Sequence, residues 1–153
     1  MLIGNLQVKV KVVSPLIKTK IPMPSYATSG SAAMDLHACC EAPIVVAARS
    51  QSKVPTGIAI ELPQNVVALV FPRSGLASKH GISLTNSVGV IDSDYRGEII
   101  CLIKNDSDED FTVKPGDRIA QLGFFPVYQV EWEEVSDLSS TQRGTGGFGS
   151  TGV

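Results

Sequence analysis

Apolar and polar residues alternate at every second position along much of this chain. In Leu6–Val12, leucine and valine alternate with glutamine and lysine, and in Ile58–Leu62 isoleucine and leucine occupy every second position. Late in the chain, Tyr128–Glu133 alternates aromatic residues and valine with glutamine and glutamate. A period of two predicts strands with one face on a core and the other in water.

Three further segments are mostly apolar and have the length of a strand. Val66–Phe71 reads VVALVF without a polar residue, which predicts a strand buried on both faces. Glu98–Ile103 and Ile119–Phe125 are similar runs. Because strands follow one another with little helical pattern between them, we expect an all-β sandwich, jelly roll or barrel.

Short polar segments separate the expected strands. Lys114–Asp117 (KPGD) suits a type II turn, because proline pre-sets the second position and glycine accepts the positive φ of the third. We expect Asn86–Gly89 to close a four-residue hairpin loop. The one helical segment, Ser74–His80, has Ser74 as a candidate N-cap and Gly81 as a candidate C-terminal cap.

Composition limits the classes of protein to which the chain can belong. Its 153 residues suggest one domain, and 43% hydrophobic against 18% charged residues excludes a disordered chain. A net charge of -2 argues against a broad basic surface, so no nucleic-acid partner is expected. No apolar run approaches the ~20 residues that span a membrane, so no membrane partner is expected either.

The cysteines and the first residues bear on the compartment. Cys39 and Cys40 are adjacent and Cys101 stands alone, so there is neither a CxxC pair nor an even-numbered disulfide framework. Met1–Gln7 lacks a signal-peptide profile, and no Arg-rich transit segment precedes the first expected strand. We therefore expect a reduced, cytoplasmic protein.

The end of the chain differs from the rest. Arg143–Val153 holds five of the 14 glycines and one aromatic residue, Phe148. We expect residues 1–142 to form the β domain and residues 143–153 a flexible glycine-rich lid. Gly144–Gly149 fits G-x-G-x-x-G, but no strand and helix flank it, so it is not a dinucleotide fingerprint. Two interpretations stay open: a mobile tail, or a flap whose amides and hydroxyls wrap an anion.

Two polar segments are candidates for chemistry. Arg73 and Ser74 open the short helix, where free N–H groups and the positive end of the helix dipole suit an anion; the alternative is a cap beside a surface arginine. Ile91–Glu98 combines carboxylates with a tyrosine and an arginine, and its alternative is a solvated turn. His37 and His80 have no partner at ligand spacing, so no zinc site is expected.

Five segments of the chain form one ordered set: Ala32–Ala38 (AAMDLHA), Pro72–Ala77 (PRSGLA), Gly89–Gly97 (GVIDSDYRG), Pro115–Leu122 (PGDRIAQL) and Arg143–Ser150 (RGTGGFGS). Taken together, they resemble the ordered motifs of the homotrimeric deoxyuridine triphosphatase (dUTPase) family. The five matches follow the family order and span most of the chain. The family usually has glycine where Ala33 stands.

The resemblance implies a β jelly roll and a homotrimer whose active sites are shared between subunits. It implies hydrolysis of dUTP to dUMP and pyrophosphate, which supplies dUMP for thymidylate synthesis and keeps uracil out of DNA. The implied cofactor is Mg²⁺, held by substrate phosphates and waters and not directly by side chains, as is common for this ion.

The resemblance also implies the site residues. Uracil and deoxyribose would be bound through Asn86, Gly89, Val90, Ile91, Asp92, Tyr95 and Ile100. Among these, Asp92 would hold the 3′-hydroxyl and activate the attacking water, and Tyr95 would exclude a 2′-hydroxyl. The phosphates would be bound by Arg73, Ser74, Gly75 and Gln121, with Asp35 organising that end of the site. From another subunit, the lid would close over uracil and the γ-phosphate through Arg143, Phe148, Gly149 and Ser150.

Two other functions stay open. The related dCTP deaminases share the fold, but they carry a catalytic glutamate at the position of Leu102 and a second serine at that of Gly75, so deamination is disfavoured. A non-enzymatic nucleotide-binding or structural trimer is the other alternative. The presence of Arg73, Asp92 and Tyr95 argues against it.

Overall fold

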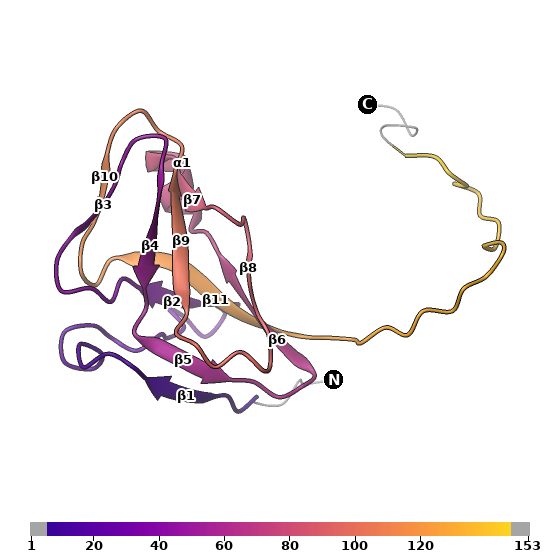
Figure 1. The fold of residues 1–153 in the computed structure, drawn as a ribbon, viewed down its shortest axis with the longest axis horizontal. Helices are drawn as coiled ribbons and strands as arrows, with labels where there is room; N and C mark the ends of the chain where they lie inside the picture. Colours follow the sequence, from indigo (N-terminus) through magenta and orange to yellow (C-terminus); the bar gives the residue numbers. More distant parts are fainter. Residues whose placement is uncertain (1–5, 148–153) are drawn as a thin grey trace.

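The computed structural model of this protein describes residues 6–147, which form an all-β body with one short helix. The strands pair antiparallel in four small sheets. Figure 1 shows how the strands are arranged. The expected all-β class is therefore confirmed. Among the described residues, no helix combines the length and the apolar character that crossing a membrane requires.

The largest sheet has the order β2–β11–β6–β8. It contains β2 (Met34–His37), β11 (Arg118–Pro126), β6 (Val66–Phe71) and β8 (Gly89–Ile91). A three-stranded sheet contains β4 (Gln51–Pro55), β9 (Ile100–Asn105) and β7 (Ile82–Leu84). The two remaining pairs are β1 (Lys9–Val12) with β5 (Ile58–Glu61), and β3 (Ile44–Val46) with β10 (Phe111–Val113).

One cluster of buried apolar side chains draws on all four sheets. Its fully buried members include Leu36 of β2, Val46 of β3, Val54 of β4, Ile58 of β5 and Ile103 of β9. Burying a side chain of this size contributes roughly 1.5–3 kcal/mol. The cluster therefore joins the small sheets into one body, although none of them is large enough to be stable alone.

Local patterns predicted several elements well. The helix α1 spans Ser74–His80 and ends at Gly81, whose φ of 65° is left-handed as the C-terminal cap requires. The KPGD turn is confirmed, because Gly116 has a φ of 85° and the Asp117 N–H donates to the Lys114 carbonyl at 3.0 Å. The expected N-cap is wrong by one residue: the cap is Arg73, which makes no capping bond through its side chain.

Other expectations are wrong at places where the structure depends on pairing between strands that are far apart in the sequence. Asn86–Gly89 does not close a hairpin, because β7 pairs with β9 while β8 pairs with β6 in a different sheet. Strand β6 alternates between buried and half-buried residues and is not buried on both faces. Strand β1 begins only at Lys9 and pairs with β5 alone, and all four of its residues are exposed in the single chain.

The expected strand Tyr128–Glu133 is absent. Residues 127–147, here called the arm, leave the body after β11 as an extended segment without a strand, drawn in orange and yellow in Figure 1. The side chains of Tyr128 and Trp132 are 90% and 94% exposed. A strand needs a neighbouring backbone, and beyond a bond from Val127 N–H to the Asn65 carbonyl the body offers the arm none.

Candidate active site

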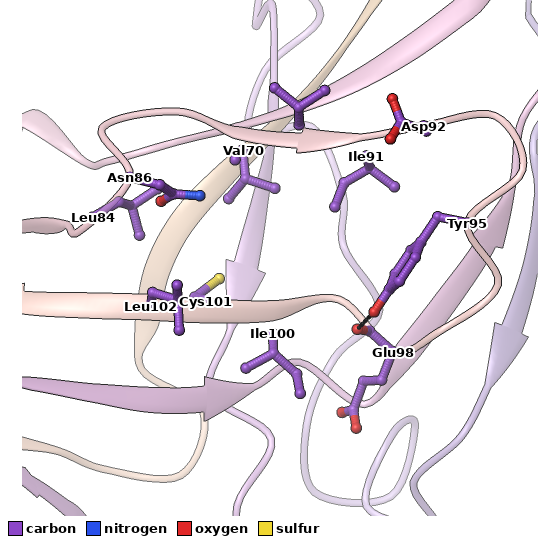
Figure 2. Close-up of a pocket in the computed structure, with 12 residues that line it drawn as sticks. Val70, Leu84, Asn86, Ile91, Asp92, Tyr95, Glu98, Ile100, Cys101 and Leu102 are labelled. Atoms are coloured by element: carbon purple, nitrogen blue, oxygen red, sulfur yellow. Dashed lines mark hydrogen bonds between the residues drawn. The ribbon is translucent and has the colours of Figure 1, made fainter.

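A hollow of about 230 Å³ opens beside strands β8 and β9, and we call it the β8–β9 hollow (Figure 2). All seven residues expected at the base and sugar line it: Asn86, Gly89, Val90, Ile91, Asp92, Tyr95 and Ile100. They come from the loop before β8, from β8 itself, from the turn after it and from the start of β9. The structure thus brings together one complete group of the predicted site.

A tight turn positions Asp92 and Tyr95. The Tyr95 N–H donates to the Asp92 carbonyl at 3.2 Å, which closes the turn after β8. Arg96 then secures it, because its Nη1 donates to the carbonyls of Ser93 and Tyr95 at 2.7 and 3.1 Å. Both the carboxylate and the phenol ring therefore reach the hollow from a short, fixed segment.

The opposite end of the hollow is formed by Asn86 and Gly89. Gly89 lies across from Val70 in the β6–β8 ladder, and a Cβ at Gly89 would approach the Val70 Cβ to 3.2 Å and the Asn86 amide nitrogen to 3.5 Å. A glycine here leaves the backbone amide open to a ligand. Figure 2 shows the Asn86 amide and the Asp92 carboxylate at opposite ends of the hollow.

Five lining residues were not among the expected binding residues: the apolar Val70 and Leu84, and the three sequence neighbours Glu98, Cys101 and Leu102. Burial raises the pKa of the Cys101 thiol to about 12, so this cysteine is an uncharged wall residue and not a nucleophile at neutral pH. The expected segment Glu98–Ile103 brings all three close together in sequence. The sequence alone does not tell which of these three residues lines a cavity, because that depends on how the strands pack.

A second polar group forms at the other side of the large sheet. Asp35 lies opposite Gln121 in the β2–β11 ladder, and Gln121 lies opposite Phe71 of β6, two residues before Arg73. Because cross-strand partners project from the same face, these side chains gather there. We call the group Asp35, Arg73, Arg118 and Gln121 the Asp35 cluster.

Two arginines share the Asp35 carboxylate. Arg73 Nε lies 3.3 Å from Oδ1, and Arg118 Nη1 donates to Oδ2 at 3.2 Å. Arg73 Nη1 also donates to the Arg118 carbonyl at 3.3 Å. A bulge in β11 between Arg118 and Ala120 redirects the Arg118 side chain, which sequence reasoning had not assigned to the site. Among residues 6–147, Arg73 Nε is a buried donor without an aligned acceptor.

The remaining expected residues do not join the hollow in this chain. Arg73, Ser74, Gly75 and Gln121 are absent from its lining. Ser74 and Gly75 are exposed at the start of α1. Arg143 lies on the arm, where its Nε donates to the Gly146 carbonyl at 2.8 Å. Phe148, Gly149 and Ser150 lie outside the described residues.

His37 adjoins the Asp35 cluster without having been assigned a role. It faces Arg118 in the β2–β11 ladder. Burial lowers the pKa of His37 below its ordinary value; Asp35 opposes this shift, and Arg118 and Arg73 reinforce it. The imidazole is therefore held closer to its neutral form beside two arginines.

The structure thus defines a class of protein: an all-β fold with a small hollow beside β8 and β9 and, apart from it, two arginines around one carboxylate. The chain belongs to the dUTPase family, because the family model described as dUTPase matches residues 19–152. The solved dUTPase of Staphylococcus bacteriophage 80alpha with dUPNHPP superposes with a TM-score of 0.84 at 26% identity, covering 96% of this chain and 99% of that one. The expected jelly-roll-like β fold is thereby confirmed.

Curated relatives agree with the family. The deoxyuridine 5'-triphosphate nucleotidohydrolase of Shigella flexneri serotype 5b (strain 8401) is 46% identical over 147 residues, covering 95% of this chain and 97% of the relative. The protein of the same name from Enterobacter sp. (strain 638) is 45% identical over the same coverage. The similarity therefore spans nearly the whole chain and is not confined to single motifs.

Proposed function

We propose that this chain hydrolyses dUTP to dUMP and pyrophosphate. The observation that carries the proposal is the β8–β9 hollow, where all seven residues expected for a deoxyuridine line one cavity. Its volume of about 230 Å³ is below the ~300–1,000 Å³ of pockets for drug-sized ligands. It suits a base with its sugar and leaves the triphosphate to groups outside it.

The base and the sugar are read by different parts of the hollow. The Asn86 amide and the backbone of Gly89–Ile91 face the polar edge of uracil, with the backbone of Ile100 beside it. The Tyr95 ring packs under the deoxyribose, so a 2′-hydroxyl is excluded by its size. Asp92 accepts a hydrogen bond from the 3′-hydroxyl.

Asp92 is also the proposed general base. A water molecule attacks the α-phosphorus while Asp92 takes its proton, so a new P–O bond forms on one side. On the other side the bond to the bridging oxygen breaks, and pyrophosphate leaves with that electron pair. Positioning of the water and removal of its proton are the contributions of this carboxylate.

The phosphates are bound at the Asp35 cluster and at the start of α1. Arg73, Ser74, Gly75 and Gln121 supply donors, and Asp35 holds the two guanidinium groups in place. Because Asp35 is already engaged by two arginines, the substrate phosphates and waters are the better ligands for Mg²⁺, which neutralises phosphate charge when bound. A protein with a net charge of -2 needs such local cations to hold a tetra-anion.

The active unit in this proposal is a homotrimer with shared sites. Two observations support it: the Asp35 cluster does not line the hollow of its own chain, and the arm carries a strand pattern without a partner strand. The exposed Tyr128, Val130 and Trp132 would be buried against another subunit. Residues 143–153 then form the lid over a neighbouring site, where Arg143, Phe148, Gly149 and Ser150 contact uracil and the γ-phosphate.

The lining of the hollow argues against deamination, the first of the two alternative functions. Leu102 lines it at the position where a deaminase places its catalytic glutamate, and a leucine cannot transfer protons. The test is to supply dUTP, UTP and dCTP in turn and to measure pyrophosphate and ammonia. Pyrophosphate from dUTP alone is expected. Ammonia from dCTP would establish a deaminase instead, and nucleotide binding without turnover would establish a non-catalytic protein.

The proposal also covers the cellular compartment in which the enzyme acts. Cys39, Cys40 and Cys101 are all free thiols. Free thiols suit a reducing compartment, so we place the enzyme in the cytoplasm.

A further inference from the structure

We propose that Glu98 is a positioning residue that fixes the Tyr95 ring and thereby sharpens the choice of deoxyribose over ribose. The inference rests on the proposed function, in which Tyr95 packs under the sugar. Glu98 is half-buried at the rim of the β8–β9 hollow, and the five motifs had not singled it out as a binding residue.

The Glu98 side chain is fastened to a rigid turn. Its Oε1 accepts a hydrogen bond from the Gly57 N–H at 2.7 Å. Gly57 is buried with a φ of 75°, and a Cβ there would meet the Cys39 Sγ at 2.5 Å and the Ile17 Cγ1 at 2.8 Å. Only glycine fits this turn without strain, so the turn has little freedom to follow a moving partner.

The backbone next to Glu98 is held by the same turn. The Thr56 hydroxyl donates to the Ile99 carbonyl at 2.7 Å, and the Ile99 N–H donates to the Ile58 carbonyl at 2.9 Å. These two bonds hold the backbone at Ile99, just before β9 begins. The carboxylate of Glu98 adds a further attachment to the same turn, at the Gly57 N–H. A hydrogen bond to an ionised acceptor is roughly twice as strong as a neutral one.

The backbone of Glu98 in turn holds Tyr95. The Tyr95 hydroxyl donates to the Glu98 carbonyl at 3.0 Å, as Figure 2 shows. Between them, Gly97 has no room for a side chain, because a Cβ there would overlap the Tyr95 hydroxyl. The ring therefore lies directly on the Gly97–Glu98 backbone. A shift of this backbone moves the ring, and steric exclusion of a 2′-hydroxyl depends on where the ring stands.

Glu98→Ala is the first test. It removes the acceptor of the Gly57 N–H and is expected to lower the ratio of kcat/KM for dUTP over UTP about tenfold, the size of a methylene-scale change in a pocket. The kcat for dUTP should fall much less, because Asp92 is untouched. Glu98→Gln keeps an oxygen acceptor and should restore most of the ratio.

Glu61→Ala is the matched control. Glu61 also accepts one bond at 2.7 Å, from Lys9 Nζ, but it does not line the hollow. Its ratio should equal that of the parent enzyme. A Glu98→Ala enzyme with the parent ratio, whatever its melting temperature, would overturn the positioning role and leave a merely structural one.

Two further measurements keep the inference testable if Glu98→Ala fails to fold or the chain fails to hydrolyse dUTP. Tyr95→Phe keeps the ring and removes its bond to Glu98, so it should lower the ratio to a similar degree; an unchanged ratio contradicts the proposal. Binding of dUMP against UMP, measured by calorimetry, needs no turnover. There the parent should prefer dUMP and Glu98→Ala should prefer it less. A preference that is equal in both proteins overturns the inference independently of catalysis.

Discussion

The β body, residues 6–126, and the arm, residues 127–147, carry the same kind of sequence pattern with opposite outcomes. In the body, alternating segments such as Ile58–Glu61 find antiparallel partners and contribute to one buried cluster. In the arm, Tyr128 and Trp132 alternate with polar residues equally well, yet both are almost fully exposed. Alternation therefore specifies that a segment has an apolar face and does not specify which surface will cover it.

The two regions also divide the proposed function. The body contains the whole β8–β9 hollow and the Asp35 cluster, while the arm leads to the last of the five motifs. From this division we expect changes in the body to affect chemistry or folding within one subunit. Changes in the arm should affect assembly or closure and leave the fold of each subunit intact.

Asp92→Asn should have the largest effect. The variant keeps the shape of the side chain at the hollow but removes the proton acceptor, and a general base contributes ~10²–10⁴-fold to the rate. The kcat for dUTP should fall by that factor while the melting temperature stays close to that of the parent. An Asn variant with the parent rate of pyrophosphate release would show that Asp92 is not the base.

Ile103→Ala and Trp132→Ser compare the two regions directly. Ile103 is fully buried in the body, so its truncation should lower the free energy of unfolding by about 2–5 kcal/mol in denaturant titrations. Trp132 is 94% exposed in the single chain, so its replacement should leave the circular dichroism spectrum unchanged. In sedimentation experiments it should shift the proposed trimer toward smaller species. If Trp132→Ser sediments like the parent, the arm does not mediate assembly.

Truncation after Gln142 tests the lid. Closure over the substrate positions the reacting groups, and a misplacement of about 1 Å costs on the order of 10²-fold, so kcat should fall by at least about that factor. The melting temperature should hardly change, because the removed residues are too rich in glycine to add to the core. A truncated enzyme that keeps its kcat, or one that unfolds, contradicts the lid.

His37→Gln should have the smallest effect, and one that depends on pH. Burial lowers the pKa of His37 in the folded chain, so the unfolded chain binds a proton at higher pH than the folded one. Stability contributed by the neutral ring is present above the ordinary value of 6.5 and is lost as pH falls below it. Melting temperatures at about pH 7.5 and pH 5.5 should therefore differ less in His37→Gln than in the parent. An equal difference would exclude His37 as the source.

Local sequence determined the elements whose causes lie within a few residues. The KPGD turn follows from proline and glycine at fixed positions, and the end of α1 follows from Gly81. The family resemblance also named seven of the residues that line the hollow, because β8, its turn and β9 are close in sequence. Glu98 lies outside the five motifs, and its bond to Gly57 could not be foreseen because the two residues are 41 positions apart in the chain.

What only the tertiary structure decided is the choice of partners. The tertiary structure places β7 and β8 in different sheets, although only four residues separate them. It also places Arg118, which lies next to the bulge in β11, beside Asp35 of β2. It also left the arm without a neighbouring strand. The physical reason is that alternation and turn residues act over a few positions. Strand pairing depends instead on which apolar faces can be buried together, and this involves residues far apart in the chain. For the arm, we expect the covering surface to come from a second subunit.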